Sequence, residues 1–236
     1  MLLEISNLNV ILSGLHILQD LSLYVNQGEL VVVVGANGSG KSTLLRTIMG
    51  MNKPQAGAIN FKGTQIGGAA SYTIVSRGLC LVAEGRQLFR SLTARENLCL
   101  GAYHYRKDKK RVEANLEKVY ALFPVLKENS SRIASTFSGG EQQMIALGQG
   151  LMSEPELMMI DELSLGLAPK IIETLFKIIK ELNQNNMSIL LIEQNTRQSL
   201  QIADRAYVLE TGRIILTGTG KELLDNPTVK EAYLGL

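Results

Sequence analysis

The sequence predicts an α/β fold with a largely parallel core sheet, and two observations support that prediction. Residues 30–34 and 157–160 are wholly apolar and 188–192 nearly so, as expected of strands buried on both faces. From residue 157 onward, strand-like and helix-like segments also alternate, which is typical of parallel sheets with crossover helices. At 236 residues the chain is long enough to bury a large core as one domain.

The segments before residue 86 and those between 86 and 153 differ in pattern. The first part is rich in strand-like runs, which we expect at 3–5, 17–25, 30–34 and 58–61. The middle part is helical, and two capping boxes, Thr93 with Glu96 and Ser138 with Glu141, each predict a helix start. Residues 1–85 and 154–236 should therefore form one α/β core, and 86–153 a helical insertion within the same domain.

The last third of the sequence predicts a helix at 170–182, a hairpin formed by 205–209 and 213–216, and two short helices at the C-terminal end. Thr219 with Glu222 forms the capping box of the first short helix, and Asn226-Pro227 begins the second.

Composition narrows the class of protein. The apolar runs are far shorter than the ~18 residues that cross a bilayer, and no charged-then-apolar leader opens the chain. Cys80 and Cys99 lack metal-ligand spacing, so we expect two buried free thiols in a reducing cytoplasm. A net charge of +2 gives no support for nucleic-acid binding. The basic run 106–111 precedes an amphipathic helix pattern, which favours a solvated helix start over a lipid or RNA contact.

A phosphate-binding loop follows the apolar run 30–34. Residues 35–43 match G-x-x-x-x-G-K-[ST], and a helix-compatible stretch, 42–49, follows them. The glycines allow successive backbone N–H groups to point at one phosphate chain, and the helix N-terminus adds positive charge there. Lys41 would contact the β- and γ-phosphates, and Ser42 would bind Mg²⁺. We therefore expect a nucleoside triphosphate to bind Gly35, Ala36, Asn37, Gly38, Ser39, Gly40, Lys41, Ser42 and Thr43.

Two acids follow the apolar run 157–160. Ligands of α/β sheets lie at the carboxyl ends of strands, so Asp161 is expected to help bind the metal. Glu162, one residue further on, points differently and can act as a base toward an attacking water. An acid pair that only caps a helix is the alternative, but it does not explain the neighbouring phosphate loop.

The segment 137–143 offers a second anion site. Two glycines follow the N-cap Ser138 and expose backbone N–H groups at a helix start, about 20 residues before Asp161. Taken alone, Ser-Gly-Gly-Glu is only a good helix cap.

With the loop at 35–43, the Ser-Gly-Gly-Glu element and the acid pair, the chain resembles the ATP-binding cassette (ABC) family over essentially its full length. The resemblance implies a P-loop NTPase fold of the ABC-ATPase type, with a mixed β-sheet core, an antiparallel N-terminal β-subdomain and a helical signature subdomain. It also implies a head-to-tail pair of ATPase subunits, homo- or heterodimeric. ATP bound to the loop of one subunit would then contact the signature of the other, here Ser138, Gly139, Gly140 and Glu141.

Further segments resemble the LivF-type ATPase of branched-chain amino acid importers: 83–86, 101–103, 164–169, 192–195 and 207–212. That resemblance implies ATP hydrolysis with Mg²⁺ at the cytoplasmic face of a prokaryotic inner membrane. The implied partners are a second ATPase, two membrane permease subunits and, indirectly, an extracytoplasmic solute-binding protein. Urea or short amides are carried by close relatives and remain alternative cargoes.

Two residues follow the LivF-type pattern while differing from most cassettes. Glu84 stands where many relatives have a Gln that contacts Mg²⁺, and by resemblance it would bind the metal and couple to the permease. Gln194 stands where many have a His that senses the γ-phosphate; its amide donates a hydrogen bond but carries no positive charge. Hydrolysis would then depend more heavily on Glu162.

Three departures are particular to this chain. Ser13 stands where an aromatic residue usually stacks on adenine, so we expect weaker adenine binding or an aromatic from elsewhere, such as Tyr24. Leu163 replaces a usual Pro and would loosen the turn that orients Glu162. Gln149 replaces a common Arg and removes a charge-assisted contact.

Other functions remain open from sequence alone. The ATPase could drive import, or it could bind ATP mainly to close the dimer while its own site turns over slowly. A soluble cassette ATPase of DNA repair, ribosome function or cluster assembly usually has insertions, metal-binding Cys or paired cassettes, which this sequence lacks. A P-loop kinase would have no use for residues 138–141.

Overall fold

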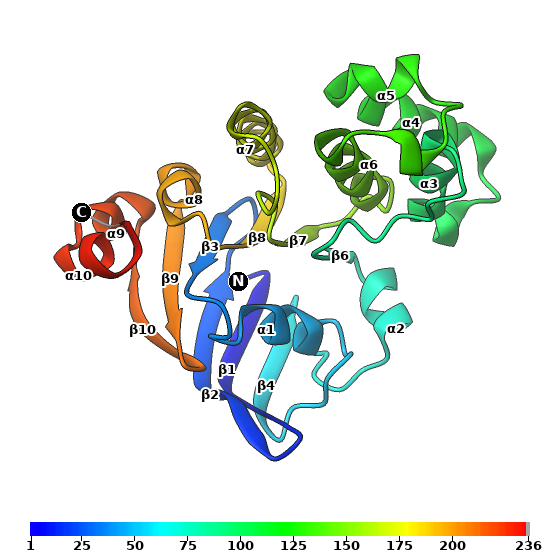
Figure 1. Cartoon of the computed structure of the whole chain (residues 1–236). Helices are drawn as coiled ribbons and strands as arrows, with labels where there is room; N and C mark the ends of the chain where they lie inside the picture. The colour runs from blue at the N-terminus through cyan, green and yellow to red at the C-terminus, as the bar shows by residue number, and fades with distance from the viewer. Residues whose placement is uncertain (235–236) are drawn as a thin grey trace.

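A computed structural model of the chain describes residues 1–234 and confirms the α/β fold class, with an antiparallel N-terminal sheet and a mixed core sheet. It contains a four-stranded antiparallel sheet in the order β2-β1-β4-β5 and a six-stranded sheet in the order β10-β9-β3-β8-β7-β6 (Figure 1). The first sheet consists of β1 (Leu3–Leu12), β2 (Leu15–Val25), β4 (Ala56–Phe61) and β5 (Thr64–Gln65).

The second sheet is parallel except for β10, which pairs antiparallel with β9 at the edge. The carboxyl ends of its parallel strands therefore meet along one edge, where ligands of such sheets bind. Its strands are β3 (Leu30–Val34), β6 (Leu79–Val82), β7 (Leu157–Asp161), β8 (Ser188–Glu193), β9 (Arg205–Glu210) and β10 (Arg213–Gly218).

The helices fall into groups by position (Figure 1). Helix α1 lies between the two sheets, α7 and α8 cover the opposite face of the larger sheet, and α3 to α6 gather at one end of the molecule. The helices are α1 (Lys41–Ile48), α2 (Ser71–Ser76), α3 (Ala94–Gly101), α4 (Lys109–Leu122), α5 (Pro124–Glu128), α6 (Gly139–Leu151), α7 (Pro169–Gln184), α8 (Thr196–Ile202), α9 (Gly220–Asp225) and α10 (Pro227–Val229). Shorter helical turns are η1 (Tyr103–Tyr105), η2 (Ala134–Thr136) and η3 (Lys230–Leu234).

The larger sheet separates two hydrophobic cores, which explains its apolar strands. Along β3, residues 30, 32 and 34 pack into the core under α6 and α7, and 31 and 33 pack into the core shared with the antiparallel sheet. Every residue of β3 and β7 is buried, as predicted for strands covered on both faces. This rigid layer carries the loops that follow its strands.

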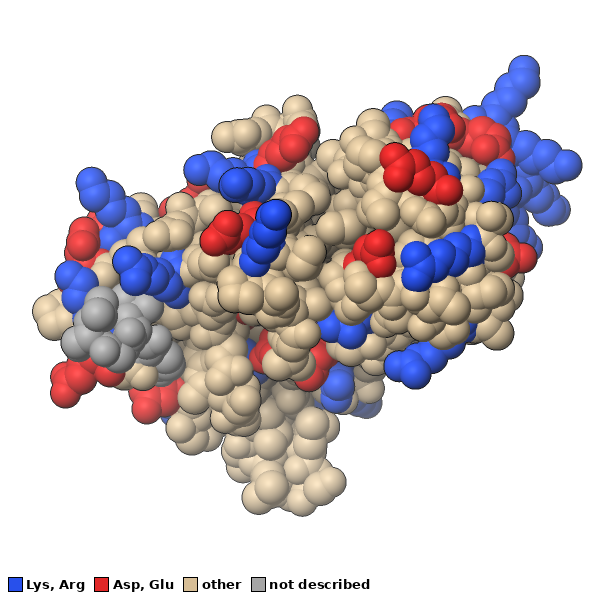
Figure 2. Space-filling model, turned by 45° about the horizontal axis from the view of Figure 1, so that its top comes forward, with Lys and Arg blue, Asp and Glu red and all other residues tan. Residues whose placement is uncertain are grey.

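The three predicted capping boxes are present. Thr93, Ser138 and Thr219 each accept a hydrogen bond from the backbone N–H three residues later, and the Glu side chain at that position accepts one from the backbone N–H of the Thr or Ser. The basic run 106–111 lies exposed at the start of α4, where Asp108 is the N-cap, as the solvated-helix prediction requires. Figure 2 shows Lys and Arg side chains densest at the end of the molecule that the helices α3 to α6 form.

Several elements differ from the sequence predictions. Strand β1 extends to Leu12 rather than residue 5, because register shifts, with Asn7 at φ 48°, interrupt the alternation on which the prediction depended. Strand β6 and helix α2 were not predicted, because β6 has only 4 residues and α2 only 6. Such short segments carry little periodic signal.

The two cysteines are free, but the prediction that both are buried is wrong, because each side chain is partly exposed. The protein around the Cys80 sulfur nevertheless raises the pKa of that thiol to about 11, so it stays protonated at neutral pH. Among residues 1–234, no helix combines the length and apolar character needed to span a bilayer.

Candidate nucleotide site

The loop between β3 and α1 takes the compact shape that its glycines permit. Gly38 and Gly40 have φ values of +79° and +107°, a region that favours glycine. A Cβ on Gly35 would lie 2.2 Å from the backbone oxygen of Leu209 on β9, so only glycine fits there. The loop therefore packs against the sheet while the N-terminus of α1 points outward from the strand edge.

Lys41 is buried at the centre of this loop. Its Nζ donates hydrogen bonds to the backbone oxygens of Gly35 and Ala36, each at 2.9 Å, and lies 3.9 Å from Oε1 of Glu162. An ammonium group with three donors is thus held between the loop and a carboxylate. A phosphate entering the loop would meet this cation already in place.

Ser42 and Asp161 present two oxygen atoms side by side. The Ser42 hydroxyl donates to Oδ1 of Asp161 at 3.0 Å, from the first turn of α1 to the end of β7. Burial raises the pKa of Asp161, and the nearby Glu84 carboxylate raises it further. Mg²⁺ prefers oxygen ligands and needs only one or two from protein when phosphates and water complete the shell. The pair fits that ion.

Glu162 shares this environment. Burial raises its pKa first, Lys41 opposes the shift, and the Glu84 and Asp161 carboxylates add to it. Its backbone adopts φ +55°, which is uncommon for a residue other than glycine, and its N–H donates to the Ile192 oxygen at 3.0 Å. Strained conformations of this kind cluster at functional sites.

A cavity of about 420 Å³ joins these elements. It brings together residues of the phosphate loop, Glu84 and Glu162, as the sequence predicted. Two aliphatic side chains that the sequence reasoning missed, Ile17 and Leu165, also contribute. The lining residues are Ile17, Asn37, Gly38, Gly40, Lys41, Ser42, Thr43, Glu84, Glu162 and Leu165. Gln194 is exposed just beyond β8 and is not among them.

Ser13, at the expected adenine position, and Tyr24, the suggested substitute aromatic, both lie outside this cavity. Ser13 is exposed in the turn between β1 and β2, at φ +50°, outside the cavity lining. Tyr24 lies seven residues along β2 from Ile17, roughly 23 Å at ~3.3 Å per residue. Its ring packs 4.3 Å from the Arg205 guanidinium at the start of β9. The suggestion that Tyr24 supplies the aromatic surface is therefore wrong.

The absence of a Pro at Leu163 predicted a loose turn after Glu162. The position of the Leu163 side chain argues against that prediction. The side chain is only 1% exposed and belongs to the core under α7. Packing takes over the restriction that a Pro ring would otherwise provide.

The segment 138–141 begins α6 and does not line the 420 Å³ cavity. Ser138 is exposed, and its backbone N–H donates to Oε2 of Glu141 at 2.7 Å. The Arg86 guanidinium packs over Gly139, and Gly140 is covered by Ile171. This helix start is thus ordered by its own chain while its first residue faces outward.

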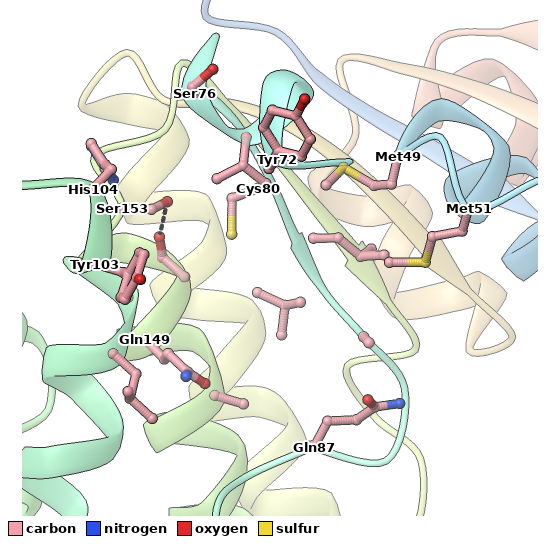
Figure 3. Close-up of a pocket in the computed structure, with 18 of the residues that line it drawn as sticks. Met49, Met51, Tyr72, Ser76, Cys80, Gln87, Tyr103, His104, Gln149 and Ser153 are labelled. Carbon is pink, nitrogen blue, oxygen red and sulfur yellow. Dashed lines mark hydrogen bonds between the residues drawn. The ribbon is translucent and has the colours of Figure 1, made fainter. Parts of the chain in front are cut away.

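A groove of about 630 Å³ lies between α2 and β6 on one side and η1 and α6 on the other (Figure 3). Met49, Met51, Tyr72 and Tyr103 line it, and Gln149 reaches it from α6. Tyr72 and Tyr103 are 79% and 64% exposed, so two large rings at this groove face solvent. Sequence reasoning missed this groove because its walls come from five separate segments of the chain.

The chain belongs to the ABC transporter family, whose model matches residues 18–164. It is 49% identical over 218 residues to a high-affinity branched-chain amino acid transport ATP-binding protein, BraG of Pseudomonas aeruginosa, covering 92% of this chain and 93% of that protein. It is 35% identical to a probable branched-chain amino acid transport ATP-binding protein, LivF of Archaeoglobus fulgidus, covering 100% and 99%.

Solved structures agree with this assignment. The fold matches an ATP-binding cassette of an ABC transporter in its ADP conformation, with a TM-score of 0.88 at 28% identity, covering 100% of this chain and 99% of that one. The protein is an ABC ATPase, and its cassette binds ATP.

Proposed function

We propose that this ATPase powers import of branched-chain amino acids across a prokaryotic inner membrane, from its cytoplasmic face. The observation that carries the ATPase part is the cavity that joins the phosphate loop to Glu84 and Glu162, with Ser42 and Asp161 in contact beside it. The cargo rests on the 49% identity to a branched-chain amino acid transport protein over nearly its whole length.

In this proposal the triphosphate binds to residues 35–43, where Lys41 neutralises charge on the β- and γ-phosphates. Ser42, Asp161 and Glu84 hold Mg²⁺, which when bound stabilises negative charge on the phosphate oxygens. Glu162 accepts a hydrogen bond from the attacking water, and the Gln194 amide donates one to the γ-phosphate. The raised pKa of Glu162 makes it a better base than an ordinary carboxylate.

The signature at 138–141 acts on ATP held by a second ATPase subunit, identical or related. Support for this comes from the exposure of Ser138 and its absence from this chain's own cavity lining. The N-terminus of α6 would then contribute N–H groups to the partner's γ-phosphate. ATP would join the two halves, and hydrolysis would release them.

The 630 Å³ groove is the proposed contact with one of two permease subunits. Its apolar walls and exposed rings suit a short amphipathic helix. Residues 84–92 run from the nucleotide cavity toward this groove, since Glu84 lines the cavity while Arg86 and Gln87 line the groove. An extracytoplasmic solute-binding protein would deliver cargo without touching this chain. We also propose that residues 1–236 form one domain, with 86–153 as its helical subdomain.

Glu162→Gln tests the motor. In the assembled transporter, the substitution should reduce ATP hydrolysis at least about 100-fold while ATP still binds. Unchanged hydrolysis would leave the second candidate, a subunit whose site closes the dimer but barely turns over. That candidate is favoured by the lining of the cavity, which includes no aromatic side chain to stack on adenine. Uptake measured with labelled leucine against urea or acetamide decides the cargo.

A further inference from the structure

A buried carboxylate that the proposed chemistry does not use lies beside the active-site loops. Glu193 is the last residue of β8 and is fully buried. Removing a carboxylate from water is costly unless its oxygens are well hydrogen-bonded, and burial here raises the pKa of Glu193. The hydrogen-bond donors to Glu193 therefore indicate the role of this buried carboxylate.

All three donors to Glu193 come from loops at the carboxyl edge of the sheet. Oε1 accepts the Ser164 N–H at 2.9 Å. Oε2 accepts the Ser164 hydroxyl at 2.8 Å and the Asn195 N–H at 3.2 Å. One carboxylate thus joins the loop after β7 to the loop after β8.

Each of these loops carries a residue with a proposed role in hydrolysis. Ser164 lies two residues beyond Glu162 and next to Leu165, which lines the nucleotide cavity. Asn195 directly follows Gln194 and caps α8, since its side chain accepts from the Gln198 N–H. A backbone hydrogen bond from the Glu162 N–H to the Ile192 oxygen also joins the loop after β7 to the end of β8.

We propose that Glu193 is a positioning residue for ATP hydrolysis. It fixes the loop that carries Glu162 against the loop that carries Gln194, so that both face one γ-phosphate. The inference rests on the proposed roles of those two residues. It explains why an ionisable side chain occupies a core position where an apolar one would pack without desolvation cost.

Glu193→Gln is the discriminating substitution because it is isosteric. The introduced amide oxygen can still accept from the Ser164 N–H, and the Ser164 hydroxyl can rotate to accept from the amide NH₂. The amide has only one acceptor oxygen, so in one orientation the Asn195 N–H faces the NH₂ group, and in the flipped orientation the Ser164 N–H does. Either way, one backbone hydrogen bond that holds the two loops together is lost while the packing stays.

We expect kcat of the assembled ATPase to fall about 10- to 100-fold, the scale of a misplacement near 1 Å. The Kd for ATP should change less than about two-fold, because Glu193 does not line the cavity. In a Gln194→Ala background the same substitution should lower kcat less than about two-fold further, because the two changes then remove one function.

Glu29→Gln provides the matched control. Glu29 directly precedes β3, at the end opposite to the phosphate loop, and accepts from the Asn26 N–H and from Arg205 at 2.8 and 2.9 Å. This control should lower thermal stability and leave kcat within about two-fold.

Two results would overturn the inference: unchanged kcat in Glu193→Gln, or effects of Glu193→Gln and Gln194→Ala that simply multiply. Glu162→Gln, measured alongside, tests the catalytic role of Glu162 separately from the positioning role of Glu193. If that variant remains fully active, the proposed catalytic role of Glu162 fails by itself; if it is inactive while Glu193→Gln is normal, only the positioning role fails.

Discussion

Leu163 offers a direct test of how the turn after Glu162 is held. Its side chain is 1% exposed, while Leu165, two residues later, is 50% exposed. Truncating a fully buried Leu to Ala removes its transfer free energy and leaves a cavity, which together cost about 2–5 kcal/mol. Truncating the exposed Leu should change the free energy of unfolding by less than about 0.5 kcal/mol. The pair differs in burial but not in chemistry.

The assay is urea unfolding of the full chain followed by far-UV circular dichroism, since the sequence has no Trp. Leu163→Ala should lose about 3 kcal/mol, which corresponds to a fall in Tm of about 6–12 °C for a chain of this size. Leu165→Ala is the control. A loss below about 1 kcal/mol in Leu163→Ala, or equal losses in both variants, would refute the claim that core packing restrains this turn in place of Pro.

Two further predictions concern the nucleotide. Lys41→Ala should weaken ATP binding about 10- to 100-fold, because charged hydrogen bonds contribute about 1.5–3 kcal/mol; calorimetric titration measures it, and an unchanged Kd would contradict the assigned phosphate contact. The raised pKa of Glu162 predicts a kcat/KM that rises with pH through a limb above the ordinary Glu range, since only the carboxylate can accept the water proton. Removing the Glu84 charge with Glu84→Gln should move that limb to lower pH, and a limb that stays in place would show that Glu84 does not act on Glu162.

Much of the fold was predictable because its signals are local. A capping box spans four residues, so Ser138 and Glu141 predict their helix without knowledge of anything distant. Strands β3 and β7 are covered on both faces, and such burial requires the continuous apolar runs that the sequence shows. The phosphate loop is equally local, since glycines at fixed spacing set its backbone.

Contacts between distant segments were not predictable. Tyr24 was a reasonable aromatic candidate by composition, yet strand direction places it far along β2 from the cavity. In the sequence, Leu163 indicated only the loss of a restraining Pro, although its effect on the turn after Glu162 depends on the core around its side chain. The groove lined by Tyr72 and Tyr103 comes from segments that become neighbours only on folding.

The sequence by itself determined the class of fold, the phosphate loop and the acids that follow β7, because each depends on residues adjacent along the chain. Only the tertiary structure decided that Ile17 and Leu165 line the cavity and that Glu193 joins two loops. The physical reason is that the sequence around a buried carboxylate does not reveal whether its hydrogen-bond donors lie nearby or 29 residues away. Folding alone sets which donors it meets.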